Sequence, residues 1–356
     1  MPERALARVD LAAITRNCRR LERALAPGAR LGVVVKADGY GHGAARAAEA
    51  ALAGGAQRLF VATAREAADL GDQPVPVAIM GALSPEELRI ALAARAEITA
   101  WDRDFAAGLP PGTRVHVKLD TGMGRLGTRD PGEATAVAEA VEAAGGEVAG
   151  LMTHFATADE RGDAFFGDQL ARFAAWAEPL RERFPRALLH AANSAGTLRD
   201  QAAHFDLVRC GIAIYGLDPF QQDPAGEDLV PALELVSYVA AVKPLAPGES
   251  VGYGRRFVAR EATNVATVPI GYGDGWRRGL TNDAEVVVRG RRRPLIGTVS
   301  MDNVTVDVGP GTDVGVGDEV TLIGRGILAE EVARRLGTIN YEITCGLSAR
   351  VRREHA

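Results

Sequence analysis

Lys36 is the first residue whose type and position could carry chemistry. It directly follows the apolar run Val33–Val35, and a glycine-rich turn with Tyr40 comes after it, in the segment VVVKADGYGHG. A lysine is almost never fully buried without a partner, and burial lowers its pKa. A neutral amine at such a place can form a Schiff base with an aldehyde. The ordinary alternative is a lysine that merely extends from a strand end into solvent.

Other polar residues follow apolar runs in the same way. There are five such groups: Lys36; Asp120 and Arg125; His154; Asn193 and Ser194; and Arg209 with Gly211 and Ile212. In a parallel barrel the carboxyl ends of all strands meet at one rim, where barrel enzymes carry their active sites. Phosphate groups often bind after the seventh and eighth strands. The spacing therefore predicts one site that joins these groups.

The elements that must position these groups alternate between short apolar runs and alanine-rich helical segments. Apolar runs of this kind between helices are typical of a parallel sheet covered on both faces. The runs are 31–36, 58–63, 75–81, 96–101, 114–120, 147–155, 187–193 and 205–210. Eight repeats predict an α/β fold, a closed (β/α)8 TIM-type barrel. A six-stranded dinucleotide-binding sheet is the alternative, but its first strand would be followed by a glycine fingerprint that this sequence lacks.

Local signals mark where helices of this barrel begin. Asp10 is of the type that caps a helix N-terminus, and apolar residues follow it on one helical face, at Leu11, Ile14, Cys18, Leu21 and Leu25. The sequence Ser84-Pro85-Glu86-Glu87 is a capping box with proline at the first helical position. Both signals predict helices on the outside of the barrel.

The chain changes in texture after about residue 228. Valine-rich segments there are separated by Gly, Pro and Asp turns, a pattern typical of antiparallel strands. The segments are 234–243, 264–270, 284–289, 294–299, 304–308 and 318–323, and one helix is expected over 329–336. We therefore expect a barrel domain at 1–228 and a mostly antiparallel β domain at 229–356. Residues 1–9 are a candidate strand of the second domain.

The composition fits a soluble protein of two domains. The chain has 356 residues, more than one ordinary domain of ~150, and 47% of them are hydrophobic. A net charge of −5 argues against nucleic acid as a partner. No run of ~18 apolar residues predicts a membrane span, and the N-terminus lacks a signal-peptide core. The scattered cysteines Cys18, Cys210 and Cys345 fit a reducing cytoplasm and offer no metal site.

Motif blocks along the whole chain carry a resemblance to a known family. In the first half they are the Lys36 segment, HVKLDTGMGRLG at 116–127, GLMTHFATAD at 150–159, HAANSAG at 190–196 and VRCGIAIYG at 208–216. In the second half they are SVGYG at 250–254, IGYGDG at 270–275, GTVSMDNVTVDV at 297–308 and NYEITCGLSARV at 340–351. In order and spacing the chain resembles the alanine racemase family, which uses pyridoxal 5'-phosphate and has fold type III.

The resemblance implies a set of cofactor-binding residues. Lys36 would hold pyridoxal phosphate as a Schiff base, and Arg209 would face the pyridine nitrogen of the cofactor. The other residues implied are Tyr40, His154, Asn193, Ser194, Gly211, Ile212 and Tyr341. Because arginine donates hydrogen bonds and does not give up its proton, the ring nitrogen should stay neutral and be a weaker electron sink.

The resemblance also implies two catalytic bases on opposite faces of the substrate's α carbon. Lys36 would serve the D face and Tyr253 the L face. A free tyrosine titrates near ~10, so it must be tuned to act at neutral pH. In the family a hydrogen-bond chain from the tyrosine through His154 to Arg209 has this role, and this sequence retains all three residues.

A further set of residues is implied for the substrate. Its carboxylate would meet Arg125 and the Met301-Asp302 segment, and Tyr272 would narrow the pocket around a small side chain. Lys118 matches a lysine that is often carbamylated in the family. A carbamate is anionic and could orient Arg125 through a bidentate pair.

Several residues also have ordinary structural interpretations. Taken without the family, Tyr253 and Tyr272 in glycine-flanked turns would be packing residues, and His154 would be a buried core histidine. Structural roles are expected for His42, His190 and His204. The chain has Asp38-Gly39 where the family usually has Asn-Ala, and Cys210 where proline is common. These departures remove none of the catalytic groups implied.

We therefore expect a cytoplasmic isomerase that interconverts L-alanine and D-alanine and supplies D-alanine for peptidoglycan. Its partners would be the amino acid and a second copy of the chain, in a homodimer with shared active sites. A serine or broad-range racemase of the same fold is the alternative. A barrel-only pyridoxal-phosphate carrier would lack the β domain with Tyr253. The acidic and cysteine motifs of decarboxylases that act on basic amino acids do not occur in the sequence.

Overall fold

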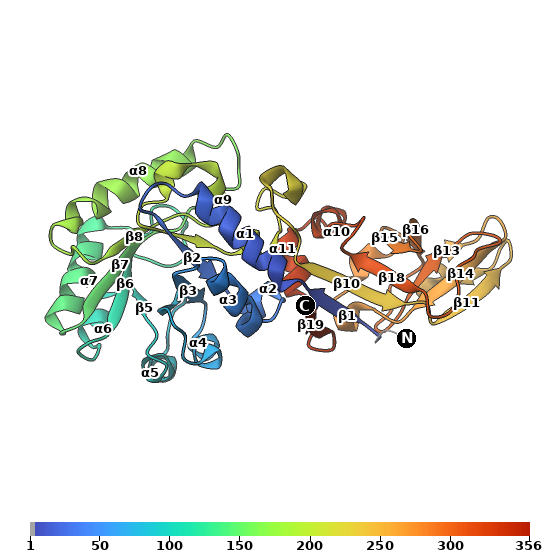
Figure 1. Cartoon of the computed structure of the whole chain (residues 1–356), viewed down its shortest axis with the longest axis horizontal. Helices are drawn as coiled ribbons and strands as arrows, with labels where there is room; N and C mark the ends of the chain where they lie inside the picture. Colours follow the sequence, from blue (N-terminus) through green and yellow to red (C-terminus); the bar gives the residue numbers. More distant parts are fainter. Residues whose placement is uncertain (1–3) are drawn as a thin grey trace.

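The computed structural model describes residues 4–356 and consists of two lobes (Figure 1). In one lobe helices surround short strands, and the other lobe is built mainly of strands. Both ends of the described chain lie in the strand-rich lobe, because β1 (Leu6–Val9) and β19 (Arg352–His355) are parallel neighbours in its sheet. The chain thus starts in one lobe, forms the other, and returns.

The helical lobe contains eight parallel strands in two four-stranded sheets, with the orders β4-β3-β2-β9 and β5-β6-β7-β8. The strands are β2 (Arg30–Val34), β3 (Arg58–Val61), β4 (Val77–Ile79), β5 (Ile98–Ala100), β6 (Arg114–Lys118), β7 (Glu147–Met152), β8 (Leu188–His190) and β9 (Leu207–Cys210). Each lies within one of the eight apolar runs that the sequence marked, except that β2 begins one residue earlier.

Hydrogen bonds at the sheet edges close the two sheets into one barrel. Between β4 and β5, the Ile79 N–H donates to the Glu97 carbonyl and the Glu97 N–H to the Val77 carbonyl, both at 2.8 Å. Between β8 and β9, the Asp206 N–H donates to the Leu189 carbonyl at 3.0 Å. The predicted (β/α)8 barrel is confirmed.

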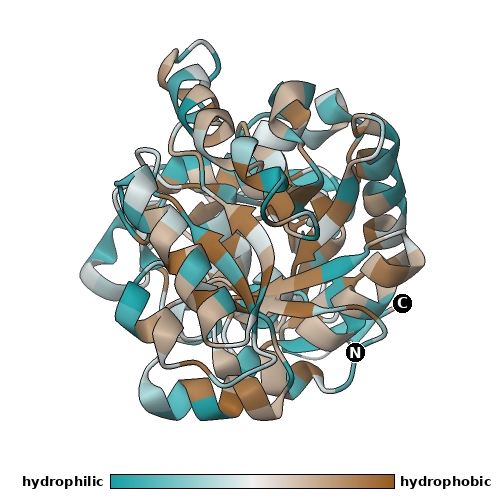
Figure 2. Ribbon diagram, turned by 90° about the vertical axis from the view of Figure 1, so that its left-hand side faces the viewer, coloured by the Kyte–Doolittle hydropathy of each residue, from teal (hydrophilic) through white to brown (hydrophobic). Residues whose placement is uncertain are grey.

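Helices surround the barrel strands. They are α1 (Leu11–Ala24), α3 (Ala44–Ala53), α4 (Ala64–Leu70), α5 (Pro85–Ala93), α6 (Arg103–Ala107), α7 (Pro131–Ala143), α8 (Phe165–Ala177) and α9 (Ser194–Arg199). Figure 2 looks onto this lobe and shows mostly hydrophobic strands near the centre, with hydrophilic residues spread over the helices around them. No helix within residues 4–356 is long and apolar enough to cross a membrane.

The predicted helix starts are present. The Asp10 side chain accepts a hydrogen bond from the Ala13 N–H at 3.0 Å and so caps α1, whose residues Ile14, Cys18 and Leu21 are buried. Ser84 and Glu87 form the capping box of α5. These caps satisfy backbone donors that have no partner within the helix.

The second lobe is a nine-stranded sheet with the order β11-β14-β17-β16-β15-β18-β10-β1-β19. All its pairings are antiparallel except that of β1 with β19. The remaining strands are β10 (Leu233–Tyr238), β11 (Ala241–Leu245), β14 (Thr263–Val268), β15 (Glu285–Val288), β16 (Arg291–Ile296), β17 (Val304–Asp307) and β18 (Glu319–Ile323). A separate short hairpin joins β12 (Ser250–Val251) to β13 (Phe257–Val258). The mostly antiparallel β domain is confirmed, and its boundary at residue 228 stays a prediction.

The structure corrects the strand expected over 234–243. That segment forms two strands, because β10 pairs with β18 whereas β11 pairs with β14 in another part of the sheet. The Val239 N–H donates to the Asp318 carbonyl and the Ala240 N–H to the Thr267 carbonyl, so the chain changes neighbours at this point. The expected helix is α10 (Ala329–Leu336), and a further helix, α11 (Asn340–Cys345), was not predicted.

Candidate active site

A cavity of about 570 Å³ opens at the mouth of the barrel. It lies at the carboxyl ends of the strands, where the sequence placed the site. Its lining contains eleven of the predicted site residues: Lys36, Tyr40, Lys118, Arg125, His154, Asn193, Ser194, Arg209, Gly211, Ile212 and Tyr341. The barrel strands, together with α11 (Asn340–Cys345), thus bring together side chains that are up to 305 residues apart in sequence, as Lys36 and Tyr341 are.

Lys36 is held by an unusual turn, α2 (Lys36–Tyr40). Four successive residues in it have positive φ: Ala37 at 52°, Asp38 at 51°, Gly39 at 62° and Tyr40 at 53°. This is left-handed helical backbone, which costs roughly 1–2 kcal/mol for each residue that is not glycine. The Asp38 carboxylate caps α3 by accepting from the Ala44 N–H at 2.9 Å. The turn sharply redirects the chain just after the lysine.

The environment of Lys36 favours its neutral form. Burial lowers the pKa of its amine, and the nearby positive charge of Arg125 lowers it further, while Glu66 opposes the shift. A neutral amine is the form that attacks an aldehyde or removes a proton. Burial and Arg125 therefore shift the Lys36 amine, which lines the cavity, toward its nucleophilic neutral form.

The turn after β9 forms a polar cradle on the floor of the cavity. The Ser194 hydroxyl accepts from the Gly211 N–H at 2.9 Å and from the Ala213 N–H at 3.3 Å. A Cβ atom on Gly211 would lie 2.4 Å from the Tyr40 hydroxyl, so only glycine fits at this position. Burial raises the pKa of Tyr40 and of Tyr341 well above the usual range, so both phenols keep their protons and can donate. Because the Ser194 hydroxyl accepts both backbone N–H groups, its own hydrogen is left to donate, and hydroxyl and phenol donors of this kind suit a phosphate.

Arg209 is buried beneath the cavity, with only 2% of its surface exposed. Its Nη1 donates to His190 Nδ1 at 2.9 Å and to the His190 carbonyl at 3.0 Å. Its Nη2 donates to the carbonyls of Thr153 and Ala191 and, at 3.1 Å, to His154 Nδ1. No residue in the described chain accepts from its Nε–H. Burial lowers the pKa of Arg209 to about 10, so the group remains charged at neutral pH.

His154 is therefore an acceptor on its Nδ1 side. Burial and the charge of Arg209 lower its pKa well below the usual value, so the ring is neutral. A neutral imidazole has one N–H, and with Nδ1 accepting from Arg209 that hydrogen lies on Nε2. His154 can thus transmit the charge of Arg209 to a group that contacts Nε2.

Lys118, on β6, is also buried. Burial and then the charge of Arg209 lower the pKa of its amine to about 8. An appreciable neutral fraction at neutral pH is compatible with the predicted carbamylation, which requires the free amine. Lys118 lines the same cavity as Arg125.

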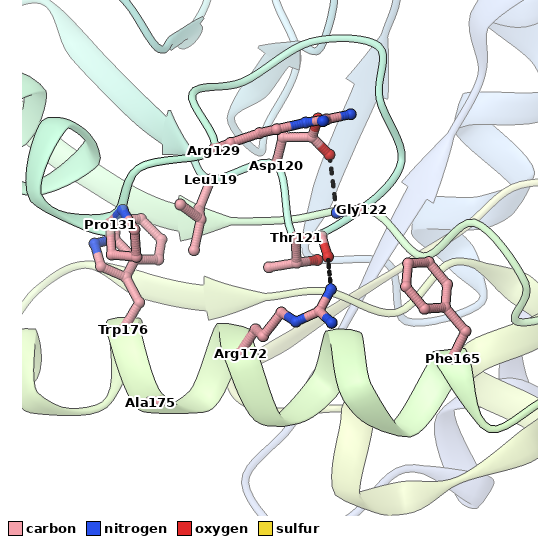
Figure 3. Close-up of a pocket in the computed structure, with 10 residues that line it drawn as sticks. All are labelled: Leu119, Asp120, Thr121, Gly122, Arg129, Pro131, Phe165, Arg172, Ala175 and Trp176. Atoms are coloured by element: carbon pink, nitrogen blue, oxygen red, sulfur yellow. Dashed lines mark hydrogen bonds and ion pairs between the residues drawn. The ribbon is translucent and has the colours of Figure 1, made fainter.

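The loop after β6 carries Arg125, and a second cavity of about 660 Å³ lies between this loop and α8 (Figure 3). There Asp120 accepts from the Gly122 N–H at 3.0 Å, and Arg172 reaches from α8 to donate to the Thr121 carbonyl at 3.0 Å. Asp120, which the sequence placed in one site with Lys36 and Arg209, lines this second cavity and not the one at the barrel mouth, because its carboxylate accepts from the Gly122 and Gly124 N–H groups of its own loop. None of the residues predicted to bind cofactor or substrate lines this second cavity. Its polar contacts hold the start of the loop in place.

Four predicted residues lie elsewhere. Tyr253, Tyr272, Met301 and Asp302 belong to the strand-rich lobe, and none of them lines the cavity of their own chain. Tyr253 is 74% exposed, and Met301 and Tyr272 are exposed as well. Asp302 is held by Arg350, whose Nη2 lies 2.7 Å from its Oδ1.

Sequence analysis missed some residues of the site. Cys345 and Gln221 line the cavity. His190, which was expected to be structural, contacts Arg209, and behind it lie His116 and Glu97. Polar residues inside otherwise apolar strand runs are the signal that could have identified these two histidines.

Comparisons with known proteins agree over the whole chain. The family model described as "Alanine racemase, N-terminal domain" matches residues 9–219, and "Alanine racemase, C-terminal domain" matches residues 232–355. An alanine racemase from Symbiobacterium thermophilum is 41% identical, over 98% of this chain and 96% of its own length. Another from Geobacillus stearothermophilus is 41% identical, over 98% of this chain and 92% of its own length.

Solved structures of similar proteins show the same architecture. An alanine racemase from Streptomyces coelicolor superposes with a TM-score of 0.92 at 37% identity and covers 99% of this chain and 98% of its own. An alanine racemase from Bacillus anthracis with bound L-Ala-P has a TM-score of 0.90 at 36% identity, covering 100% of this chain and 96% of its own.

Proposed function

Since the chain belongs to the alanine racemase family, we propose that it interconverts L-alanine and D-alanine at the barrel mouth with bound pyridoxal phosphate. The observation that carries this proposal is the pairing of a neutral-leaning amine, Lys36, with an unsatisfied buried donor, Arg209 Nε, in one cavity. We expect the D-alanine that it forms to be used for peptidoglycan.

The residues of the cavity fit pyridoxal phosphate. The amine of Lys36 suits its aldehyde, and the cradle of Ser194, Gly211 and Ile212 with the phenols of Tyr40 and Tyr341 suits its phosphate. The unpaired Nε–H of Arg209 suits the lone pair of a pyridine nitrogen. When bound, the cofactor withdraws electrons from the α carbon of the amino acid and acidifies its C–H bond.

Arg209 limits how strongly that acidification acts. With a pKa of about 10 the guanidinium keeps its protons, so it would donate a hydrogen bond to the ring nitrogen of a bound cofactor without protonating it. A neutral ring nitrogen stabilises negative charge less than a protonated one. This arrangement favours rapid return of the proton to the α carbon over side reactions.

Racemisation requires proton exchange on both faces of the α carbon. Lys36 is proposed as the base on the D face, the face that the family resemblance implies, and the lowering of its pKa by burial and Arg125 supports its role as a base. Tyr253 is proposed as the base on the L face. Its exposure of 74% on the other lobe supports its delivery to the cavity of a second subunit. The Nε2–H of His154 would then contact this tyrosine and couple it to Arg209.

A homodimer with shared active sites follows from this assignment. Tyr272, Met301 and Asp302 lie in the same lobe as Tyr253 and would enter the partner's cavity with it. Arg125 and the Met301-Asp302 segment would bind the substrate carboxylate, and a carbamate on Lys118 would orient Arg125. Several large exposed apolar side chains on one lobe are typical of an interface.

The direct test is D-amino-acid formation from a panel of L-amino acids, with Lys36→Ala and Lys243→Ala as a matched pair. The chain has three lysines, Lys36, Lys118 and Lys243, and Lys243 is exposed on β11. Lys36→Ala should abolish the visible absorbance of bound pyridoxal phosphate and nearly all turnover, whereas Lys243→Ala should retain both. Preference for serine over alanine in the panel would favour the alternative racemase, and full activity in Lys36→Ala would contradict the site.

A further inference from the structure

A continuous chain of buried polar groups runs through the barrel from its mouth toward its floor. From Arg209, the contacts are Nη1 to His190 Nδ1 at 2.9 Å, His190 Nε2 to His116 Nδ1 at 2.8 Å, and His116 Nε2 to Glu97 Oε2 at 2.9 Å. None of these four residues exposes more than 2% of its surface. The four groups form the interior relay.

The chemistry of the donors gives this relay one direction. Arginine only donates, so His190 Nδ1 must accept from Arg209. A neutral imidazole carries one hydrogen, so it lies on His190 Nε2 and is donated to His116 Nδ1. By the same argument the hydrogen of His116 lies on Nε2 and is donated to the Glu97 carboxylate. The donor Arg209 at one end and the acceptor Glu97 at the other therefore favour the same pair of tautomers, and the tautomer of each histidine depends on both of its neighbours.

Both histidines are neutral, as this argument requires. Burial lowers the pKa of His116 and of His190 well below the usual value. Nearby arginine charges lower the pKa of His116 further. His116 and Arg209 likewise lower the pKa of His190. An uncharged ring can have either tautomer, so its hydrogen-bond partners decide which one forms.

Glu97 supplies the acceptor at the far end. Its carboxylate also pairs with Arg58 and, through Oε1, with the Arg114 Nε at 2.7 Å. Arg58 Nη1 lies 3.4 Å from His116 Nε2 as well, but Nε2 carries the hydrogen and cannot accept there. Glu97, fixed by two arginines, is thus the group that receives the His116 N–H.

We propose that His116 and Glu97 are positioning residues for Arg209, acting through the tautomer of His190. This inference rests on the proposed contact of Arg209 Nε with the cofactor. With the reversed tautomer, His190 would present an N–H to the Nη1 donor of Arg209, and the guanidinium would lose an acceptor. The guanidinium plane of Arg209, which directs Nε toward the cavity, would then be less well fixed. Glu97, which lies just before β5, would thus help to fix the orientation of Arg209 at the mouth of the barrel.

The test compares His116→Phe with His116→Gln. Phenylalanine fills the space but offers no acceptor, whereas glutamine has both an acceptor for His190 and a donor for Glu97. In histidine-labelled protein, ¹⁵N NMR should show one tautomer of His190 in the unchanged chain and in His116→Gln, and a mixture in His116→Phe. With His116→Phe, kcat should fall on the order of 10- to 100-fold, the loss typical when an outer partner of a functional group is removed. The KM for alanine should change little.

Glu97→Gln serves as a second variant if His116→Phe does not fold. Arg58 and Arg114 would claim the single amide oxygen, so the amide N–H₂ would face His116 Nε2 and force the opposite tautomer. His204→Gln is the matched control, because the His204 ring is buried and, within residues 4–356, hydrogen-bonds to the Ala26 N–H and the Thr197 carbonyl and to no member of the relay. It should leave both the His190 tautomer and kcat unchanged.

The results separate this inference from the proposed function. The tautomers are measured in protein without cofactor, so they report on the relay even if the chain were not a racemase. An unchanged His190 tautomer in the folded variants would overturn the inference. So would a changed tautomer with an unchanged kcat.

Discussion

At the scale of single residues, the site depends on which protons each side chain keeps. Burial lowers the pKa of Lys36 and of His154, whereas it raises the pKa of Tyr40. The amine is thus available as a base, the imidazole stays neutral, and the phenol remains a hydrogen-bond donor. Arg209 differs from all three, since it stays charged although it is buried.

Replacing Arg209 by glutamate should increase side transamination. A carboxylate beside the ring nitrogen accepts from its N–H and so keeps that nitrogen protonated, whereas the guanidinium only donates a hydrogen bond to it. We expect racemisation to slow on the order of 10²-fold and pyruvate formed per D-alanine formed to rise. Both products can be counted in one assay. If NMR of the ring nitrogen in the unchanged holoenzyme showed it protonated, the premise would be wrong.

Tyr253→Phe should affect the two directions of exchange unequally. The phenol is the proposed base for the L face, and its loss should slow removal of the α proton from L-alanine on the order of 10²–10⁴-fold. Lys36 remains, so removal of the proton from D-alanine in a single turnover should suffer less. Solvent deuterium entering each isomer measures both steps. Equal losses in the two directions would contradict the assignment of Tyr253 to one face.

At the scale of elements, short turns after strands determine what the cavity can hold. The left-handed turn α2 redirects the chain behind Lys36, and the turn after β9 presents the Gly211 and Ile212 backbone beside Ser194. Neither turn is long enough to be stable alone, so the packed barrel must hold both. Strained backbone of this kind is typical of functional sites.

Gly211→Ala should weaken binding of pyridoxal phosphate while the chain still folds. The new methyl group would lie 2.4 Å from the buried Tyr40 hydroxyl, so either α2, which carries Tyr40, or the turn after β9 would have to move. Gly226→Ala is the matched control, because nothing lies within 4 Å of a Cβ at that position. Equilibrium dialysis gives the cofactor Kd, and the thermal midpoint reports folding. If Gly211→Ala and Gly226→Ala bound pyridoxal phosphate equally tightly, the proposal that this turn binds the phosphate would be wrong.

At the scale of the whole molecule, the division into two lobes separates the proposed bases. Lys36 lies in the barrel cavity, while Tyr253 is exposed on the strand-rich lobe. A two-fold symmetric dimer brings the same two surfaces together twice, so each barrel mouth could receive the lobe of the other chain. A monomer would carry Lys36 in its barrel and Tyr253 on its other lobe, so it would contain no complete active site.

Mixing Lys36→Ala with Tyr253→Phe subunits tests this arrangement. A mixed dimer would hold one site with both lesions and one with neither. With random re-pairing, half of the dimers are mixed and half of their sites are intact, so activity should recover to about a quarter of the unmutated level. Each variant alone should stay near zero. No recovery, despite proven subunit exchange, would mean that both bases come from one chain.

The sequence by itself determined most of the elements and eleven of the residues that line the cavity. Apolar runs and helix caps are local patterns, and the chain satisfies them locally, as Asp10 and Ser84 do. Residues that follow parallel strands must meet at one rim, so Lys36 and Arg209 could be placed together from their positions alone. The family could also be identified from the sequence, because its motif blocks occur in the same order and at the same spacing along this chain.

Only the tertiary structure decided the contacts that depend on distant neighbours. The break at Val239 between β10 and β11 arises because the two strands pair with different partners, which no local pattern encodes. The interior relay joins Glu97, His116 and His190 from three strands or strand ends, and their pKa values depend on burial that a sequence does not display. Long-range pairing and desolvation are properties of the folded chain, and they determine which polar side chains act together.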